Sequence, residues 1–381
     1  MAVNWIWQQP DWPNFTWQSE RLTPLLRECV QAQGQLLGMA ISVGGSFNAQ
    51  NELDTLLQNI VTSSAIEGEQ LNVGSVRSSL ARRLGLEALE GDYVSQRSEG
   101  LAQLLLDATQ HFAQPLTLER LLEWHQWLFP DQGTDFAARS IHVGALRGDE
   151  PMQVVSGRLD RPTVHFEAPP RLGLERQLET FLSWFDASRN QTSLDPLLRA
   201  GIAHFWFVTL HPFDDGNGRL TRTITDLALA QGEAQAIRFY AMSASILEDR
   251  CGYYRVLEAS QKATTDITGW LEWFLKTLLR SLQQAMTRIG LVLGKARFWQ
   301  AHRASAFTVE QSKVLNRLLD GGERGFVEGI SAAQYQAVAK VSKATATRHL
   351  AELLDKGCLN RLPGGGRSTR YQIRYPDDST P

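Results

Sequence analysis

HPFDDGNGRLTR, from His211 to Arg222, is the stretch that decides the fold, because it joins two predicted helices and gathers polar groups between them. The apolar residues before it predict a buried helix over 196–210, and those after it predict a second helix over 220–231. Gly216 and Gly218 allow a tight turn that exposes backbone N–H groups at the positive end of the second helix. The pattern therefore predicts a cradle for an anion.

The charged side chains in this stretch suit a polyphosphate. Arg219 and Arg222 are three positions apart, so both guanidinium groups lie on one helix face and can reach successive phosphates. Asp215 offers a hard oxygen ligand for Mg2+ shared with those phosphates, and Asn217 can hold a phosphate oxygen without adding charge. His211 has an ordinary pKa near 6.5 and can take a proton from a hydroxyl at neutral pH.

Any one of these residues alone has a common structural explanation, such as a helix cap or a solvated face, but the set points to one site. The segment matches the motif H-x-F-x-[DE]-G-N-G-R-x-x-R at every defined position, and so resembles the Fic family of protein adenylyltransferases. The resemblance implies an all-α fold and transfer of AMP from ATP, with Mg2+, to a Ser, Thr or Tyr hydroxyl of a target protein. It implies these roles: His211 as base, Asp215 as metal ligand, Gly216, Asn217 and Gly218 as phosphate cradle, and Arg219 and Arg222 as phosphate clamps.

A short β-hairpin is predicted upstream, with strands over 153–155 and 163–166. It is similar to the family's flap, which binds a target segment as an added strand. By this resemblance Val155, Ser156 and Gly157 join the binding residues, and Tyr253 falls where the family forms its adenine pocket. Core packing remains an alternative for Tyr253.

Ser63-Ser64-Ala65-Ile66-Glu67-Gly68 ends a predicted helix and resembles the family's inhibitory motif [ST]-x-x-x-E-[GN]. The resemblance implies inhibitory roles for Ser63, Glu67 and Gly68, with Glu67 paired to Arg222 in the γ-phosphate position. In some relatives the same glutamate also serves to remove AMP, so the reverse reaction stays open.

The composition favours a globular chain of more than one domain. The chain has 381 residues, of which 43% are apolar, and a net charge of -3, which gives no overall affinity for nucleic acid or anionic membrane. Its three cysteines are far apart in the sequence, and it has neither a secretory signal nor an apolar run long enough to span a membrane. We therefore expect a cytoplasmic protein without membrane contact, and a homodimer stays open.

Three parts are expected along the chain. Residues 1–110 hold an aromatic segment and the helices that carry the inhibitory motif, and 111–295 form the Fic core. Residues 300–381 predict helix, turn, helix and hairpin, a small α/β winged helix. Its second helix, over 343–356, begins with small and basic residues, and Arg367 and Arg370 fall on the wing, which favours duplex DNA as a partner.

Two other functions stay open. The chain could be a DNA-bound transcriptional regulator whose Fic core senses nucleotide, or it could transfer a group from another nucleotide or phosphodiester donor. Labelling of protein by α-labelled ATP and competition among donors separate these alternatives.

Overall fold

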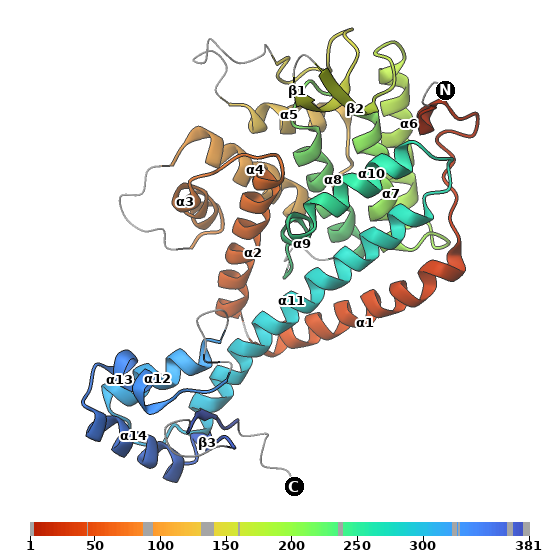
Figure 1. Cartoon of the computed structure of the whole chain (residues 1–381). Coiled ribbons are helices and arrows are strands. Elements are labelled where there is room, and N and C mark those ends of the chain that lie inside the picture. The colour runs from red at the N-terminus through yellow and green to blue at the C-terminus, as the bar shows by residue number, and fades with distance from the viewer. Residues whose placement is uncertain are drawn as a thin grey trace. The chain divides into compact units, whose positions relative to one another are not determined.

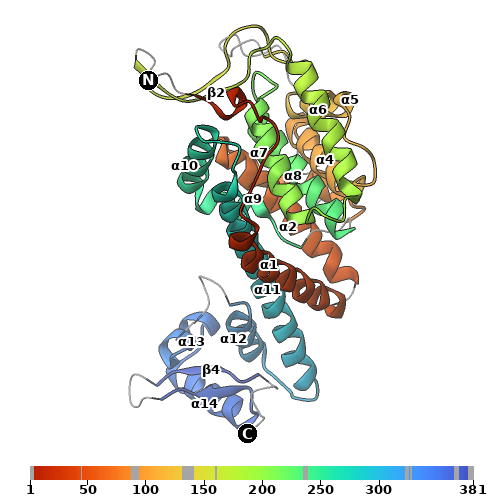
Figure 2. The same ribbon diagram turned by 90° about the vertical axis from the view of Figure 1, so that its right-hand side faces the viewer.

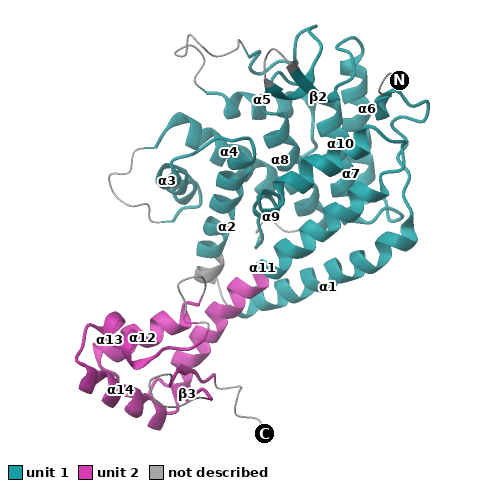
Figure 3. Cartoon of the chain, in the orientation of Figure 1, with its two compact units in different colours: residues 1–284 teal, residues 285–381 magenta. Residues whose placement is uncertain are grey.

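The fold is that of a computed structural model, which describes residues 4–43, 45–86, 94–130, 141–158, 161–234, 239–321, 326, 328–363 and 369–375. The chain divides into two compact units, Met1–Gln284 and Ala285–Pro381, coloured separately in Figure 3. Within the described residues, no helix has both the length and the apolar character needed to cross a bilayer.

The described part of unit 1 is helical apart from one hairpin and an isolated bridge between Thr16 and Asp266, as the sequence predicted for the helices and the hairpin. Its elements in chain order are η1 (Ile6–Gln8), α1 (Ser19–Val43), α2 (Gly45–Ile66), α3 (Val73–Arg83), α4 (Gln96–Gln110), α5 (Leu118–Leu128), β1 (Gln153–Arg158), β2 (Arg161–Glu167), α6 (Leu174–Ala187), η2 (Ser188–Asn190), α7 (Pro196–Leu210), α8 (Asn217–Glu233), α9 (Met242–Glu248), α10 (Arg250–Gln261) and the first half of α11 (Thr268–Ala301).

The core of unit 1 is built around α7, which runs beside α8 in both views of the chain (Figures 1 and 2). Every α7 residue from Leu197 to Leu210 is buried, as the long apolar run requires. Asp195 begins the helix by accepting a hydrogen bond from the Leu197 backbone at 2.8 Å. The helix ends at His211, whose φ of 49° is left-handed, and the chain then turns back into α8. The predicted helix, loop and helix are confirmed.

The predicted hairpin is present, and its strands are longer than the sequence indicated. β1 and β2 pair antiparallel, with a register shift between Val154 and Val155. The N-terminal aromatic segment supports the base of this hairpin. The Trp5 ring packs edge-on against Phe166 at 5.4 Å, and the Trp7 indole donates to the Glu167 carbonyl at 2.7 Å.

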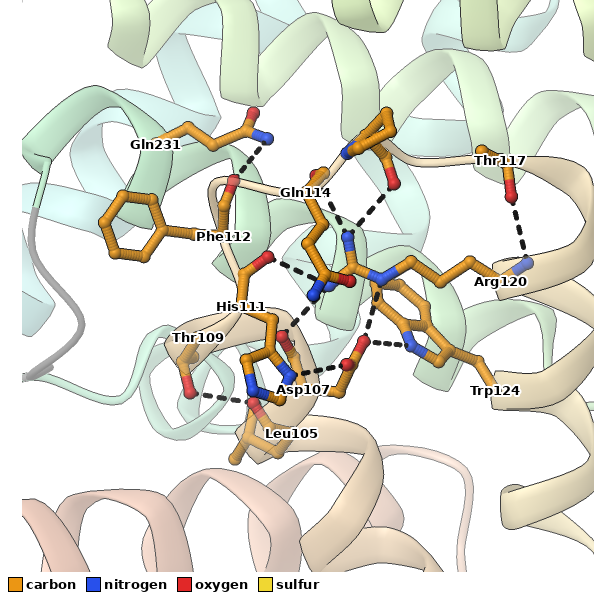
Figure 4. Close-up of polar contacts among 11 residues, drawn as sticks. Leu105, Asp107, Thr109, His111, Phe112, Gln114, Thr117, Arg120, Trp124 and Gln231 are labelled. Atoms are coloured by element: carbon orange, nitrogen blue, oxygen red, sulfur yellow. Dashed lines mark hydrogen bonds and ion pairs between the residues drawn. The ribbon is translucent and has the colours of Figure 1, made fainter.

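A largely shielded ion pair, with side chains 9% and 15% exposed, fixes α5 against the end of α4 (Figure 4). Arg120 Nε donates to Asp107 Oδ2 at 2.8 Å, and the Trp124 indole donates to the same oxygen at 2.7 Å. The other guanidinium nitrogens of Arg120 donate to four backbone carbonyls of the α4–α5 connection, those of Asp107, His111, Gln114 and Pro115. The pair therefore caps α4 and fixes the start of α5, the helix that carries His125.

Unit 2 contains α12 (Val309–Leu319), α13 (Ala332–Ala339), α14 (Lys343–Asp355), β3 (Leu359–Arg361) and β4 (Tyr371–Ile373). Thr308 and Ser331 begin α12 and α13 with reciprocal capping boxes. β3 and β4 pair antiparallel. These elements pack on one apolar cluster that includes Phe298, Tyr335 and Leu350. The predicted glycine turn at 364–366 lies outside the described residues.

Candidate active site

His211 stands at the end of α7 with its ring partly buried. Its Nδ1 lies 3.2 Å from the Val208 carbonyl, so we place the proton on Nδ1, which leaves Nε2 as an acceptor. Burial lowers the pKa of His211, and the nearby Arg147 acts in the same direction. The imidazole is therefore neutral at pH 7, the form that a general base requires.

The loop after His211 is held from inside. Asn217 accepts from the Phe213 backbone N–H at 3.0 Å and donates to the Phe213 carbonyl at 2.7 Å. The Phe213 ring is fully buried and stacks on His125 at 4.3 Å. The Asn217 amide therefore closes the loop, while its backbone belongs to the first turn of α8.

Both glycines are required by close approach. Gly216 has a φ of 80°, and a Cβ there would lie 2.7 Å from the side chain of Leu128. A Cβ on Gly218 would collide with Oε1 of Glu67. The two positions add no side chains to the N-terminal turn of α8, and the Glu67 carboxylate lies beside Gly218 there, at the helix end that favours an anion.

Both motif arginines are buried, and both are held by carboxylates. Arg222 donates to Glu67 Oε1 at 2.7 Å and to the Ser63 side chain and carbonyl at 2.8 and 2.9 Å. Arg219 donates to Glu69 Oε2 at 2.8 Å. The predicted pairing of Glu67 with Arg222 is therefore present. Glu69 is a second carboxylate at the site, which also forms an ion pair with Arg97.

One donor of each motif arginine, Nε of Arg219 and Nη1 of Arg222, is buried without a hydrogen-bond partner in the described part of the chain. A buried guanidinium N–H without an acceptor costs free energy. A phosphate oxygen is the kind of acceptor that both donors lack, and it could reach them once Glu67 and Glu69 move away from the two arginines.

Glu67 is ionised despite its surroundings. Burial would raise its pKa, but Arg222, Arg219 and His211 together hold that pKa below its ordinary value. Its carboxylate also lies over the first turn of α8, as the collision with a Cβ on Gly218 shows. Gly68, with a φ of 82°, turns the chain directly after Glu67.

Asp215 is the carboxylate best placed for a metal ion. Its side chain is 58% exposed and lies 3.6 Å from Arg219 Nη2, whereas Asp214 is engaged by His142 at 2.7 Å. Among the described residues no group of three or more His, Cys, Asp or Glu could hold a metal ion. A single carboxylate beside a phosphate site still fits Mg2+, which binds through one or two carboxylates and substrate phosphates.

A cavity of about 690 Å³ joins these residues to the hairpin. His211, Asp215, the segment 216–218 and Glu67 line one side, and Val155 and Ser156 line the other. Tyr253 also borders the cavity, but its ring is buried among Trp270 and Trp273 and its hydroxyl bonds His204 at 2.9 Å. Its neighbour Tyr254 is 38% exposed.

Three residues that the sequence did not single out shape the site. His125 Nδ1 accepts from the Gly144 backbone at 3.0 Å, and its Nε2 lies 3.2 Å from the Asp215 carbonyl. Arg147 donates to the His211 carbonyl at 2.9 Å. Glu69 holds Arg219. These residues are far from the motif in the sequence. His125 and Arg147 contact the motif backbone, and Glu69 contacts Arg219, the first motif arginine.

Comparison with known proteins agrees with this geometry. The Fic/DOC family model matches residues 115–229, and a domain of unknown function (DUF4172) matches residues 5–86. A protein named protein adenylyltransferase Fic from Drosophila virilis is 27% identical over 199 residues, which cover 50% of this chain and 36% of that protein. Its namesake from Drosophila willistoni is 24% identical over 274 residues, 67% of this chain and 50% of that protein. The chain thus spans half or less of the length of these curated relatives.

Solved structures show the same fold. A Fic family protein from Desulfovibrio desulfuricans G20 superposes with a TM-score of 0.50 at 20% identity, covering 92% of this chain and 96% of that one. A Fic domain containing signaling protein from Bacteroides thetaiotaomicron gives 0.51 at 19% identity, covering 69% and 97%.

Proposed function

This chain carries a Fic/DOC domain, and from that premise we propose that it transfers AMP from ATP to a Ser, Thr or Tyr hydroxyl of a target protein. One observation carries the proposal. Within the described residues, Arg219 and Arg222 each have one buried N–H donor without a partner, and His211 has a free acceptor nitrogen. One short loop joins His211 to the helix that carries both arginines. A triphosphate and a hydroxyl would supply the missing acceptors and the proton.

The chemistry follows from these groups. The target oxygen forms a bond to the α-phosphorus and passes its proton to Nε2 of His211. The bond between the α-phosphorus and its bridging oxygen breaks, and pyrophosphate leaves. Arg219, Arg222 and the N–H groups of the α8 N-terminus hold the phosphates, because this class of reaction depends on positioning and charge stabilisation. Asp215 would hold Mg2+, which would neutralise phosphate charge.

The hairpin would bind the target. Among the described residues β1 pairs with β2 alone, so the outer edge of β1 can accept a further strand. Val155 on β1 is 51% exposed and borders the cavity. A target segment paired along this edge would bring its hydroxyl toward His211.

We propose that Glu67 inhibits the transfer. Its carboxylate neutralises Arg222 and covers the turn of α8 that would hold a phosphate. If the inhibited and active states were otherwise equally populated, Glu67 would have to stabilise the inhibited state by roughly 2.7 kcal/mol to hold 99% of the molecules in it. An exposed ion pair, worth about 0 to 1 kcal/mol, would not be enough. Arg222 is only 3% exposed, so this pair is shielded on one side. Ser63 and Gly68 support the inhibitory position, and removal of AMP by the same site is part of the proposal.

The test is mass spectrometry of the Glu67→Gly protein after incubation with ATP, Mg2+ and cell lysate. AMP attached to protein is expected with this variant. The lysate proteins should carry no AMP after incubation with the matched variant that also carries His211→Ala. Equal incorporation by both proteins would exclude His211 as the base.

DNA binding by residues 300–381, as a winged helix, is a second proposed function. The first turns of α14 expose Lys343, Thr347 and Arg348, and Arg348 lies 3.6 Å from Glu352. Arg370 is instead engaged within unit 2, where it donates to the Gly329 carbonyl at 2.9 Å. Binding of duplex DNA that weakens with salt, without AMP incorporation, would favour a regulator that senses nucleotide.

The proposal also includes three parts of the chain, residues 1–110, 111–295 and 300–381. It takes ATP as the donor of AMP and the cytoplasm as the location of the protein. Competition among labelled nucleotides would decide the donor.

A further inference from the structure

Three side chains outside the motif form a chain of hydrogen bonds beside the cavity. Ser156 Oγ on β1 lies 2.6 Å from Nε2 of His165 on β2. Nδ1 of the same ring lies 2.8 Å from Oε2 of Glu258 on α10. Because a carboxylate only accepts, the Nδ1 proton faces Glu258, and Nε2 accepts the serine hydroxyl proton. This is the arrangement of an activated nucleophile, its base and the group that orients the base.

The local fold explains why the imidazole is held in this place. His165 is the extra residue of the register shift, since Val154 pairs with Phe166 and Val155 pairs with Val164. Phe166, the next residue, is buried against Trp5. Burial would raise the pKa of Glu258, but the pKa lies below its ordinary value, chiefly through Lys262 and then His165. The base is therefore fixed by the hairpin on one side and by an ionised carboxylate on the other.

A structural role in joining the hairpin to α10 would explain the contact between His165 and Glu258, but it would not explain why Ser156 bonds to His165. The side chains of His165 and Glu258 are 33% and 36% exposed, and an exposed pair contributes about 0 to 1 kcal/mol. The hydrogen bond between His165 and Glu258 alone would serve as a tie without Ser156. The serine instead borders the same cavity as His211 and the segment 216–218.

We infer that Ser156 is a resident acceptor that takes AMP from the nucleotide held in its own cavity, with His165 as the base that accepts the serine proton and Glu258 as the positioning residue that orients His165. The inference rests on the proposed AMP transfer. Ser156 Oγ forms a bond to the α-phosphorus, the bond to the pyrophosphate oxygen breaks, and the serine proton moves to Nε2 of His165. Glu258 stabilises the resulting imidazolium. The product carries AMP on the strand proposed to bind targets, so self-modification would limit transfer to other proteins.

The first test maps the modified residue. The full chain with Glu67→Gly is incubated with ATP and Mg2+, with and without lysate, and its peptides are analysed by mass spectrometry. AMP is expected at Ser156, retained at that position in Ser156→Thr and lost from that peptide in Ser156→Ala. Thr163, which pairs with Ser156 across the hairpin, is the internal control and should stay unmodified. AMP on other residues or lysate proteins but not on Ser156 overturns the inference alone, and AMP on no protein overturns the proposed function as well.

A second test addresses His165 and the origin of the nucleotide. His165→Gln should lower the fraction of total incorporated AMP that lies on Ser156 by about a hundredfold, the low side of what a general base contributes. An unchanged fraction overturns the role of His165. In a mixture, an isotopically heavy chain that carries Arg222→Ala and keeps Ser156 should stay unlabelled beside a light, active Glu67→Gly chain, because the heavy chain lacks a clamp for the phosphates of its own nucleotide. Labelling of the inactive chain overturns transfer within one cavity.

Discussion

Glu69 Oε2 accepts a hydrogen bond from Nη1 of Arg219 at 2.8 Å, two residues beyond the carboxylate that binds Arg222. The left-handed Gly68 lies between the two glutamates. Each motif arginine therefore has its own carboxylate from the end of α2. Because both charges are matched before any nucleotide binds, a triphosphate must compete with two ion pairs.

Glu67→Gly should raise AMP transfer. The substitution removes the carboxylate that covers the first turn of α8 and frees Arg222 for a phosphate. If the site is 99% closed, the rise reaches about a hundredfold. Incorporation of α-labelled AMP into protein measures it, and Glu67→Gln is the control that keeps the side-chain volume. Equal rates for Glu67→Gly and the unmodified chain would remove the inhibitory role.

Glu69→Gln should also raise transfer, by a smaller factor. Glu69 holds Arg219 and Arg97 but does not lie over Gly218. We expect the rate of AMP transfer to rise several-fold. The double variant Glu67→Gly/Glu69→Gln should transfer AMP at a rate close to that of Glu67→Gly alone, because both carboxylates hold the same segment. Multiplying effects in the double variant would instead mean two independent contacts.

Much of the site was predictable because its residues are neighbours in the sequence. The glycines, arginines and His211 fall at fixed offsets around one helix start, so local geometry alone brings them together. His125, Arg147 and Glu69 come from other segments, and only tertiary packing sets them against the motif. Asn217 shows another limit: its residue type suits a phosphate, yet its amide is engaged by the Phe213 backbone.

The stability of unit 1 should fall as the pH drops below about 6.5, where unfolded histidine takes up a proton. Burial lowers the pKa of His204 to about 3, and this ring bonds Thr225 and Tyr253 at 2.9 Å each. As the pH falls, the unfolded state binds the proton before the folded state does. Each such histidine therefore lowers the free energy of unfolding by about 1.4 kcal/mol for every pH unit below that point. Urea unfolding at several pH values measures the slope. His204→Gln should reduce this slope by the contribution of one proton. A slope identical to that of the unmodified chain would contradict the lowered pKa of His204.

Arg120→Ala should lower the free energy of unfolding by about 1.5 to 3 kcal/mol, because the partly buried Asp107 loses its cationic partner and keeps only Trp124 and His111. The four carbonyls that Arg120 caps also lose their donors. Denaturant unfolding followed by circular dichroism gives the value. Arg21→Ala is the matched control, since the Arg21 side chain is 54% exposed in its pair with Glu272 and should cost about 1 kcal/mol or less.

His125→Phe should separate loop positioning from ring packing. A phenyl ring keeps the stack on Phe213, but it cannot accept from the Gly144 N–H or donate to the Asp215 carbonyl. The peptide between Asp215 and Gly216 then loses its fixed orientation at the start of the cradle. We expect a loss of about 1 to 3 kcal/mol in unfolding free energy for the unpaired groups, together with a fall in transfer of at least about tenfold, since small displacements of positioned groups are costly. Burial lowers the pKa of His125, so the neutral ring makes both bonds at pH 7. A variant that keeps full transfer would show that these two bonds do not position the loop.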